Sequence, residues 1–349
     1  MSETVRDIPA FASRVAGVER VAARPSAREW ARHALFFALT ALTVAWAGMS
    51  LAIPFGDLEP ALPAPAAPLD YLLYVPQYYV LMLAAAGSFA LAHPHYILDG
   101  VKFAAALLSI LLAHESGHYV ACRLYGVDAT LPFFIPLPPP FISGTLGAFI
   151  KIKSPIPSRR ALFDIGVAGP LAGFALIIPV AVIGLLTATP DTTAAAAAAA
   201  QGHSVIIFND PPLLRLLAVP FGVADLGNAA PNPFLFAAWF GLLITSLNLM
   251  PVGQLDGGHA VYALFGRRAH KHIGRVAFLA MLALAPLGWL WHGAPTSALY
   301  VVLLFIMLRL PHPSPLDDRD TLGLTRTLVG ALTLIVFALS FLPFPVTIR

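Results

Sequence analysis

Two histidines four residues apart, His114 and His118, flank a glutamate, Glu115, inside a long apolar segment. Residues four apart lie on one face of a helix, so both imidazoles can bind a single zinc ion. The neighbouring carboxylate can then reach a water molecule at that ion. An ionised residue at the bilayer centre costs roughly 2.5–3.5 kcal/mol on insertion scales. This cost indicates that the three side chains are there for chemistry.

The two histidines leave one zinc ligand to be found, because catalytic zinc sites usually have three protein ligands. Asp256 is the best candidate, since it follows an apolar segment and precedes Gly257-Gly258 in a helix-breaking stretch. Such a stretch allows a carboxylate to turn inward at membrane depth. An isolated Asp-Gly-Gly usually indicates a simple turn, but its pairing with a membrane-embedded His-Glu-x-x-His reverses that preference. If Asp256 is not the ligand, His259 is the next candidate.

Three further residues near the motif have expected roles. Glu115 is expected to be the general base that takes a proton from the attacking water and passes it to the leaving amine. The amide of Asn248 could steady an oxyanion or hold substrate backbone, although helix–helix hydrogen bonding explains it nearly as well. Cys122 is the only cysteine and is expected to be a small buried thiol.

The composition predicts an integral, multi-pass membrane protein. Of 349 residues, 58% are hydrophobic and 11% are charged, whereas soluble domains carry about 25% charged residues. Lys and Arg occur in short clusters between apolar segments, as in cytoplasmic loops, and no broad basic face suits nucleic acid. We therefore expect the lipid bilayer as partner and no nucleic-acid partner. The expected location is the bacterial cytoplasmic (inner) membrane.

Eight apolar segments predict an all-α fold with about eight transmembrane helices around a three-helix core. They are residues 34–55, 71–92, 101–124, 161–188, 234–250, 273–291, 297–308 and 328–342. The Pro-rich residues 131–140 cannot be helical, and residues 149–153 alternate like a strand, so a re-entrant loop with a short β-hairpin is expected there. Residues 189–232 are predicted to be a polar loop with an alanine tract at 194–200.

The direction of the motif helix has two conflicting predictions. Basic clusters at 151–160 and 267–275 should face the cytoplasm, and the motif helix then ends near that face. An arginine-rich cytoplasmic amino terminus followed by two complete spans predicts the opposite direction. Either one of the first two apolar segments does not cross fully, or the amino-terminal tail lies outside.

Four motifs together resemble the site-2 protease family of intramembrane zinc metalloproteases, in the branch with bacterial and plastid members. The resemblance covers roughly residues 100–265. The motifs are His114-Glu115-Ser116-Gly117-His118, Gly144-Thr-Leu-Gly-Ala-Phe-Ile150, Gly169-Pro-Leu-Ala-Gly173, and the stretch from Asn248 to Asp256-Gly-Gly258. Members of the family often carry Asn shortly after the Gly-Pro pair, where this sequence has Gly173. That difference leaves Asn248 as the expected catalytic amide.

The resemblance implies a three-helix catalytic core with one Zn²⁺ per chain on His114, His118 and Asp256, and with Glu115 as general base. It also implies cleavage of a peptide bond in or near a transmembrane helix of a membrane-anchored protein substrate, in regulated intramembrane proteolysis. No soluble small-molecule cofactor is expected.

A substrate helix must unwind before attack, because its scissile amides are held in its own hydrogen bonds. An edge strand of the enzyme could pair with the unwound segment, as in other cases of β-strand addition. The residues expected to bind substrate in this way are Gly144, Gly147, Ala148, Phe149 and Ile150.

The chain is expected to divide into four regions: a basic tail at 1–33, accessory transmembrane segments at 34–99, the catalytic core at 100–265, and C-terminal transmembrane segments at 266–349. Two other functions fit part of the pattern. A transporter or channel would bind an ion with the intramembrane polar residues, but no internal repeat is evident. A catalytically inactive scaffold would keep zinc for structure, and the intact Glu115 argues against it.

Overall fold

Long helices make up most of the protein, and each of the eight apolar segments predicted from the sequence forms a helix. The computed structural model describes residues 24–58, 60, 62–63, 65–138, 143–189, 206–223, 230, 232–293 and 297–348. Most of the basic tail predicted at 1–33, and the alanine tract at 194–200, lie outside the described residues.

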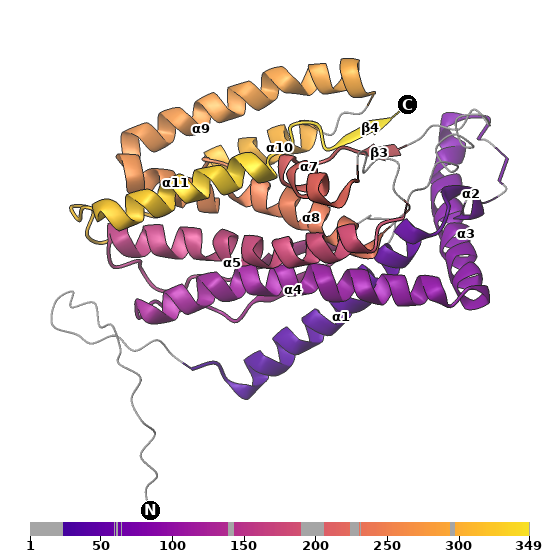
Figure 1. The fold of residues 1–349 in the computed structure, drawn as a ribbon, viewed down its shortest axis with the longest axis horizontal. Coiled ribbons are helices and arrows are strands. Elements are labelled where there is room, and N and C mark those ends of the chain that lie inside the picture. The colour runs from indigo at the N-terminus through magenta and orange to yellow at the C-terminus, as the bar shows by residue number, and fades with distance from the viewer. Residues whose placement is uncertain are drawn as a thin grey trace, which may run out of the picture.

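The elements follow one another in a simple order along the chain (Figure 1). The helices are α1 (Ala27–Ala52), α2 (Phe55–Leu58), α3 (Tyr71–Ala92), α4 (His95–Leu124), α5 (Arg159–Leu186), α7 (Pro212–Ala218), α8 (Pro233–Asn248), α9 (Asp256–His292), α10 (Ser297–Arg309) and α11 (Gly323–Ser340). The strands are β1 (Phe133–Pro136), β2 (Thr145–Phe149), β3 (Ile206–Phe208) and β4 (Val346–Ile348). Strands β1 and β2 form one antiparallel pair, and β3 and β4 form another.

Six of the described helices are long and apolar enough to cross a membrane: α1, α3 with the short 3-10 turn before it, α4, α5, α9 and α11. Helices α8 and α10, also expected to span, have 16 and 13 residues. At about 1.5 Å per residue, both are shorter than a hydrocarbon core of about 30 Å. The protein is therefore an all-α, multi-pass membrane protein with small β elements.

Polar caps fix where the helices that carry the site begin. The Ser158 side chain accepts a hydrogen bond from the backbone N–H of Ala161 and caps α5. Asn232 accepts from two backbone N–H groups at the start of α8, and Pro233 occupies the first helical position. Both arrangements satisfy amide donors that a helix cannot bond internally, so they set the helix starts beside apolar runs.

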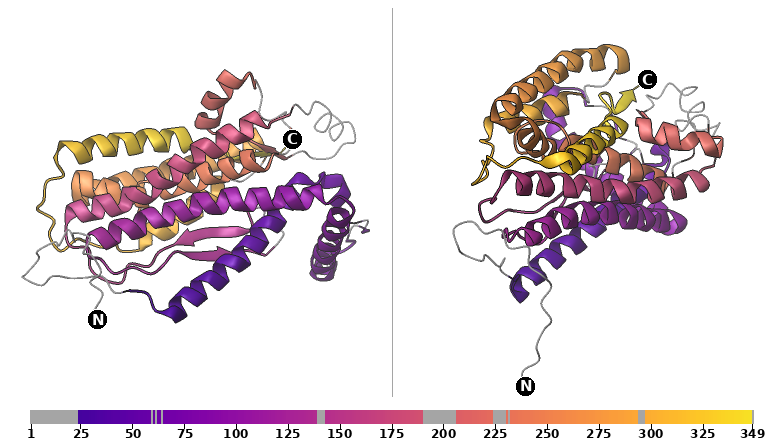
Figure 2. Two further views of the ribbon diagram at one scale, coloured as in Figure 1. Left: turned by 60° about the horizontal axis from the view of Figure 1, so that its bottom comes forward. Right: turned by 60° about the vertical axis from the view of Figure 1, so that its left-hand side comes forward.

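Helices α4 and α5 pack side by side at the centre, with α1 against the outer side of α4 and with α8 and α9 against α5 (Figures 1 and 2). The main core cluster joins Phe103, Leu107 and Ile110 of α4 to Ile177 of α5 and Leu242 of α8, all of them fully buried. The two central helices therefore have protein on most sides, which shields polar groups on their facing surfaces from lipid.

The path of α3 resolves the conflict over direction. In Figure 1, α3 lies across the end of the bundle at a steep angle to α4 and α5. The start of α1 and the end of α4 lie together, since Glu29 forms an ion pair with Lys153 and His33 contacts the carbonyl oxygen of Pro132. Because α1 leaves this end and α4 returns to it, α3 adds no net crossing between them. A cytoplasmic start of α1 is then compatible with a motif helix that ends at the same face.

The predicted hairpin is present, with its second strand earlier than expected. β2 covers Thr145–Phe149. The alternating residues 149–153 follow it, and backbone hydrogen bonds between residues 128–130 and 151–153 extend the pairing beyond the two strands. β1 lies within the Pro-rich segment. The hairpin is placed between α4 and α1 (Figure 2, left view), with β1 on the α1 side and β2 on the α4 side. Phe133 and Phe134 contact the aromatic rings of α1 and fix this arrangement.

The polar loop predicted at 189–232 is wrong for residues 206–208 and 212–221. Residues 206–221 form β3, α7 and a short 3-10 turn. The strand pairs with β4 at the far end of the chain, and Leu213 and Leu214 of α7 are buried in the main core. Both contacts are long-range, so a local pattern could not reveal them.

Candidate metal centre

Glycines of α5 let α4 approach closely enough to form the site. A Cβ atom at Gly169 would lie 2.1 Å from the His118 Nε2 atom, and one at Gly173 would lie 3.2 Å from the His114 Cβ atom. A Cβ at Gly117 of α4 would lie 2.4 Å from the backbone oxygen of Ala168. The Gly169-Pro-Leu-Ala-Gly173 motif therefore provides the space in which both imidazoles lie.

A second set of glycines brings Asp256 to the histidines. The chain leaves α8 after Asn248 and turns back through Gly253, which has a φ of +56°. A Cβ at Gly257 would lie 1.9 Å from the Leu249 oxygen, and one at Gly258 would lie 2.5 Å from the Gly253 oxygen. Only glycine fits such close backbone contacts. The Asp-Gly-Gly sequence is therefore a tight junction that fixes Asp256 at the first turn of α9.

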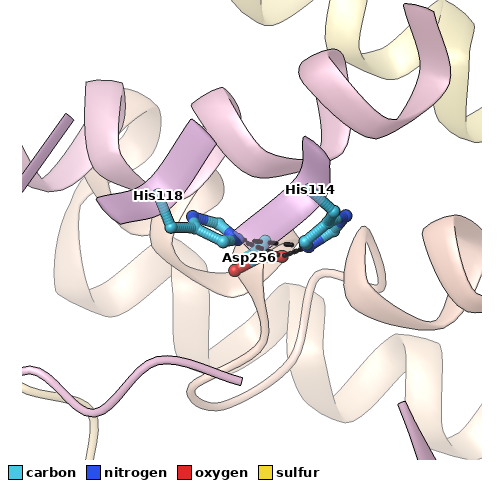
Figure 3. A group of neighbouring side chains, drawn as sticks. All are labelled: His114, His118 and Asp256. Atoms are coloured by element: carbon cyan, nitrogen blue, oxygen red, sulfur yellow. Dashed lines mark hydrogen bonds and ion pairs between the residues drawn. The ribbon is translucent and has the colours of Figure 1, made fainter. Parts of the chain in front are cut away.

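The side chains of His114, His118 and Asp256 converge on one point, from α4 and from the start of α9 (Figure 3). The Asp256 Oδ2 atom lies 3.3 Å from His114 Nε2 and 3.2 Å from His118 Nε2. The two Nε2 atoms are 3.1 Å apart. Both histidines are buried, and Asp256 is almost as well covered.

These distances fit a zinc ion. Zinc binds imidazole nitrogen and carboxylate oxygen at about 2.0–2.2 Å in tetrahedral geometry, which places ligand atoms roughly 3.3–3.6 Å apart. The observed separations of 3.1–3.3 Å lie at or up to about 0.2 Å below the lower limit of this range. Two imidazole nitrogens and a carboxylate oxygen directed at one point also need a cation or shared protons between them. The donor set of two His and one Asp therefore suits zinc.

The backbone of α5 orients one of the histidines. The His118 Nδ1 atom lies 2.7 Å from the carbonyl oxygen of Ile165, so Nδ1–H donates to that oxygen. In this tautomer Nε2 keeps its lone pair and points at His114 and Asp256. Metal-binding histidines commonly use their second nitrogen in this way, and the bond fixes the ring as a ligand.

Glu115 lies beside the three converging side chains. Its carboxylate is 4.0 Å from the His114 Nε2 atom, and the side chain is buried. The backbone of Ile150 lies close to the same carboxylate. The end of the β2 strand therefore meets the side chain that the sequence analysis assigned as general base.

Asn248 also lies at the site, as the sequence predicted. Its amide nitrogen is 3.2 Å from the His114 Nε2 atom. Because Asn248 ends α8 and Asp256 begins α9, the intervening turn places both side chains on the same side of His114. This contact joins α8 to α4, so it fits both the catalytic role and the helix–helix hydrogen bonding expected from the sequence.

The residues expected to bind substrate occupy two different places. Gly144 is packed against α1, where a Cβ would lie 2.4 Å from the Thr43 oxygen. Gly147 has a φ of +99° and open space where a Cβ would be. Ala148 and Ile150 are half-buried, and Phe149 is 45% exposed. Ile150 thus lies beside Glu115, and Gly144 anchors the hairpin to α1.

Two residues near the motif are not part of the centre. Cys122 is completely buried in an apolar cluster with Ala161 and Leu162, as expected for a structural thiol. His259 is half-buried and its Nδ1 atom is 2.9 Å from the Nε2 atom of His312, so it belongs to a neighbouring group of imidazoles. Among the described residues, the only cluster of metal-binding side chains is His114, His118 and Asp256.

Sequence reasoning missed two members of that neighbouring group. No sequence motif indicates a role for His270, which is buried and whose Nε2 atom is 3.2 Å from the Gly253 oxygen, or for His312. Both approach His259 through the fold of α9 and the chain after α10, and no sequence spacing signals this contact.

Comparison with known proteins agrees with the geometry. The sequence profile "Peptidase family M50" matches residues 102–287, more than half of the chain. "Probable zinc metalloprotease EGY1, chloroplastic" from Oryza sativa subsp. japonica is 32% identical over 251 residues, covering 71% of this chain and 41% of that protein. The Arabidopsis thaliana protein of the same name is 35% identical over 246 residues, covering 70% and 43%.

A third relative, "Probable zinc metalloprotease EGY2, chloroplastic" from Arabidopsis thaliana, is 29% identical over 248 residues, covering 71% of this chain and 42% of that protein. The chain thus spans less than half the length of these relatives. The family match includes the two histidines, the hairpin, the glycine motif of α5 and Asp256. This chain belongs to peptidase family M50, the site-2 protease family that its motifs resemble.

Proposed function

We propose that this protein is an intramembrane zinc endopeptidase that hydrolyses a peptide bond in or near a transmembrane helix of a membrane-anchored substrate. The observation that carries the proposal is the convergence of His114, His118 and Asp256 beside Glu115. Three of these four residues lie within a helix long and apolar enough to span a membrane. Membership of family M50, and relatives named as probable zinc metalloproteases, support the same activity.

The roles of the residues follow from their positions. His114, His118 and Asp256 would hold zinc, which would supply a Lewis acid that lowers the pKa of water to near neutral. Glu115 takes a proton from this water and gives it to the leaving amine. The Ile150 backbone, which lies close to this carboxylate, would help to hold it in place for both transfers. Asn248 offers an amide beside His114, where it can hydrogen-bond the oxygen of the scissile carbonyl.

Substrate binding would use the edge of β2. Within the described residues, β2 pairs with β1 on one side, and its other side faces α4. An unwound stretch of substrate that adds to this edge would run along α4 toward Glu115. Gly147 leaves open space along the strand, so a substrate side chain could lie there. Such pairing would hold the peptide extended, and it would satisfy backbone groups that lipid cannot.

The compartment is a separate matter. Six candidate spanning helices make the protein multi-pass within the described residues. The named relatives are chloroplastic plant proteins, so they give no support to the bacterial inner membrane expected from the composition. That location stays a prediction, as does the setting of regulated intramembrane proteolysis.

The substitution Glu115→Gln tests the proposed activity. It keeps the size of the side chain and removes the base, so zinc content should be unchanged while cleavage is lost. Quantitative membrane proteomics of cells that express wild type or Glu115→Gln at equal levels would identify soluble or shortened fragments of membrane proteins. Fragments produced by wild type alone are expected. Equal fragments with both proteins would refute the role of Glu115.

The substitution Asp256→Ala tests the ligand set independently of any substrate. Removal of one of three ligands should sharply lower the zinc content of the purified, detergent-solubilised protein, measured by elemental analysis. Cys122→Ala is a suitable control, because it removes a buried side chain of α4 that lies in an apolar cluster. Unchanged zinc in Asp256→Ala would mean that the third ligand lies elsewhere.

A further inference from the structure

A cavity lies behind the turn that carries Asp256, outside the proposed catalytic centre. It has a volume of about 350 Å³ and is enclosed by α9, the end of α10 and the chain that follows α10. Its polar lining consists largely of basic side chains and imidazoles. They are Arg267, His270, Lys271, Arg275, Arg309 and His312.

The charge of this cavity is unbalanced. No Asp or Glu occurs among the described residues that line it. Within the described part of the chain, none of its four Arg and Lys residues forms an ion pair, although Arg309 lies over the ring of Phe305. Other basic residues are paired, as Arg326 is with Asp164 and Lys153 with Glu29. All four side chains are exposed, so water screens part of their mutual repulsion, and an anion bound among them would offset the rest.

The floor of the cavity is polar but neutral. Burial, together with His259 and His270 nearby, lowers the pKa of His312 to about 3, so this imidazole carries no charge at neutral pH. The His312 ring stacks on Tyr262, with ring centres 4.5 Å apart and planes 5° apart. A neutral imidazole can donate one hydrogen bond to a ligand. The cavity therefore combines a positive rim with a fixed, uncharged floor.

The location favours an anion at the membrane border. Helix α9 bends at Gly266, which has a φ of +82°, and the basic residues follow the bend. Basic residues at helix ends usually mark the cytoplasmic face, and that rule explains their presence here. The rule about the cytoplasmic face does not explain why basic residues of two helices, α9 and α10, line one shared cavity. A bound anion would explain this arrangement.

We propose that this cavity binds a phosphate-bearing anion, either the headgroup of an anionic phospholipid or a free phosphate compound. Arg267, Arg275 and Arg309 present planar guanidinium groups, which bind two phosphate oxygens at once, and Lys271 adds a point charge. The volume accommodates a phosphate or diphosphate group with part of its substituent. Binding of the anion does not require the proposed peptidase activity.

The bound anion would also act on the turn that holds Asp256. Gly253, in the middle of that turn, lines the cavity, and its carbonyl oxygen contacts His270. A Cβ at Gly253 would lie 2.3 Å from the Met307 oxygen of α10, so the turn and α10 are in close contact. An anion that joins α9 to α10 would therefore hold the turn in place.

Binding to the purified, full-length protein in neutral detergent tests the proposal with defined probes. The probes are inorganic pyrophosphate, short-chain phosphatidylglycerol, and phosphatidylcholine of the same chain length as the uncharged-headgroup control. Affinity is measured by isothermal titration calorimetry and by the shift in unfolding temperature, since a ligand that binds only the folded protein stabilises it. Binding of phosphatidylglycerol alone would identify a lipid site. Binding of pyrophosphate as well would identify a site for free phosphate compounds.

Two matched double variants distinguish binding in this cavity from a general effect of surface charge. Lys271→Gln with Arg275→Gln removes two positive charges from the lining, and Arg268→Gln with Arg319→Gln removes two exposed charges outside it. All four side chains are exposed, so both proteins should fold. We expect the first pair to weaken binding about tenfold or more and the second to leave it within about twofold. Equal loss in both pairs, or no binding of either anionic probe at millimolar concentration, would overturn the proposal.

Discussion

The substitution Gly169→Ala gives a sharp test of how α5 positions the metal centre. Alanine is a better helix former than glycine by about 1 kcal/mol, so the change favours α5 itself. The new Cβ would lie 2.1 Å from His118 Nε2 and 2.4 Å from its Cδ2 atom. The clash is with the ring that carries the ligand atom, and the Nδ1 atom of this ring is already bonded to the Ile165 carbonyl of the same helix.

The size of the effect follows from these distances. An ordinary contact needs about 3.4 Å, so a separation of 2.1 Å requires the ring to retreat by 3.4 − 2.1 = 1.3 Å. Zinc ligands tolerate deviations of about 0.2 Å. His118 would therefore stop being a ligand, or α5 would have to move away from α4. Loss of an outer hydrogen bond to a ligand costs about 10–100-fold in metal affinity, so we expect a loss of about 100-fold or more here.

The assay is zinc affinity in chelator-buffered solution, with the unfolding temperature recorded for the same samples. Gly87→Ala is the matched control: it lies in α3, and its Cβ would meet nothing closer than 3.7 Å. Gly169→Ala should lose zinc, or should lose both zinc and several degrees of unfolding temperature if the helices separate. Zinc affinity within about twofold of Gly87→Ala would refute the placement of His118 against α5.

Three further predictions concern the rest of the site and its support. Asn248→Ala should lower the rate of cleavage about 100-fold while zinc content stays constant, because its amide is expected to meet the scissile carbonyl; a fall in zinc would show that it positions His114 instead. Gly147→Ala should weaken substrate binding without loss of zinc, since a φ of +99° strains alanine by about 1 kcal/mol or more and distorts the edge of β2; unchanged kinetics would exclude strand pairing at this position. Arg326→Lys should lower the unfolding free energy by no more than about 1 kcal/mol, because its two-pronged contact with Asp164 is partly exposed, and a chemical denaturation curve would reveal any larger effect.

Much of the site was predictable because its signals are local. The spacing of His114 and His118 on one helix and the helix-breaking sequence around Asp256 each carry their meaning in a few residues. The apolar segments likewise predicted every long helix, since burial in lipid requires continuous apolar runs. Features that depend on distant contacts were not predictable: the steep angle of α3, the pairing of β3 with β4, and the approach of His312 to His259.

The structure also gives a reason why glycine recurs in every motif around the centre. The ligands lie where a glycine backbone is in direct contact with another backbone or with a ligand ring: Gly117 with Ala168, Gly257 with Leu249, and Gly169 with the His118 ring. In lipid, helices cannot be pressed together by water, so close backbone contact and hydrogen bonds must supply the attraction. Glycines provide the close contact and allow the hydrogen bond here. Because Gly169 has no side chain, the His118 ring approaches α5 closely enough for its Nδ1 atom to lie 2.7 Å from the Ile165 carbonyl oxygen. The metal ligands are thus held by the packing of α4, α5 and the start of α9, and a change at any of these glycines should be measured first as a loss of zinc.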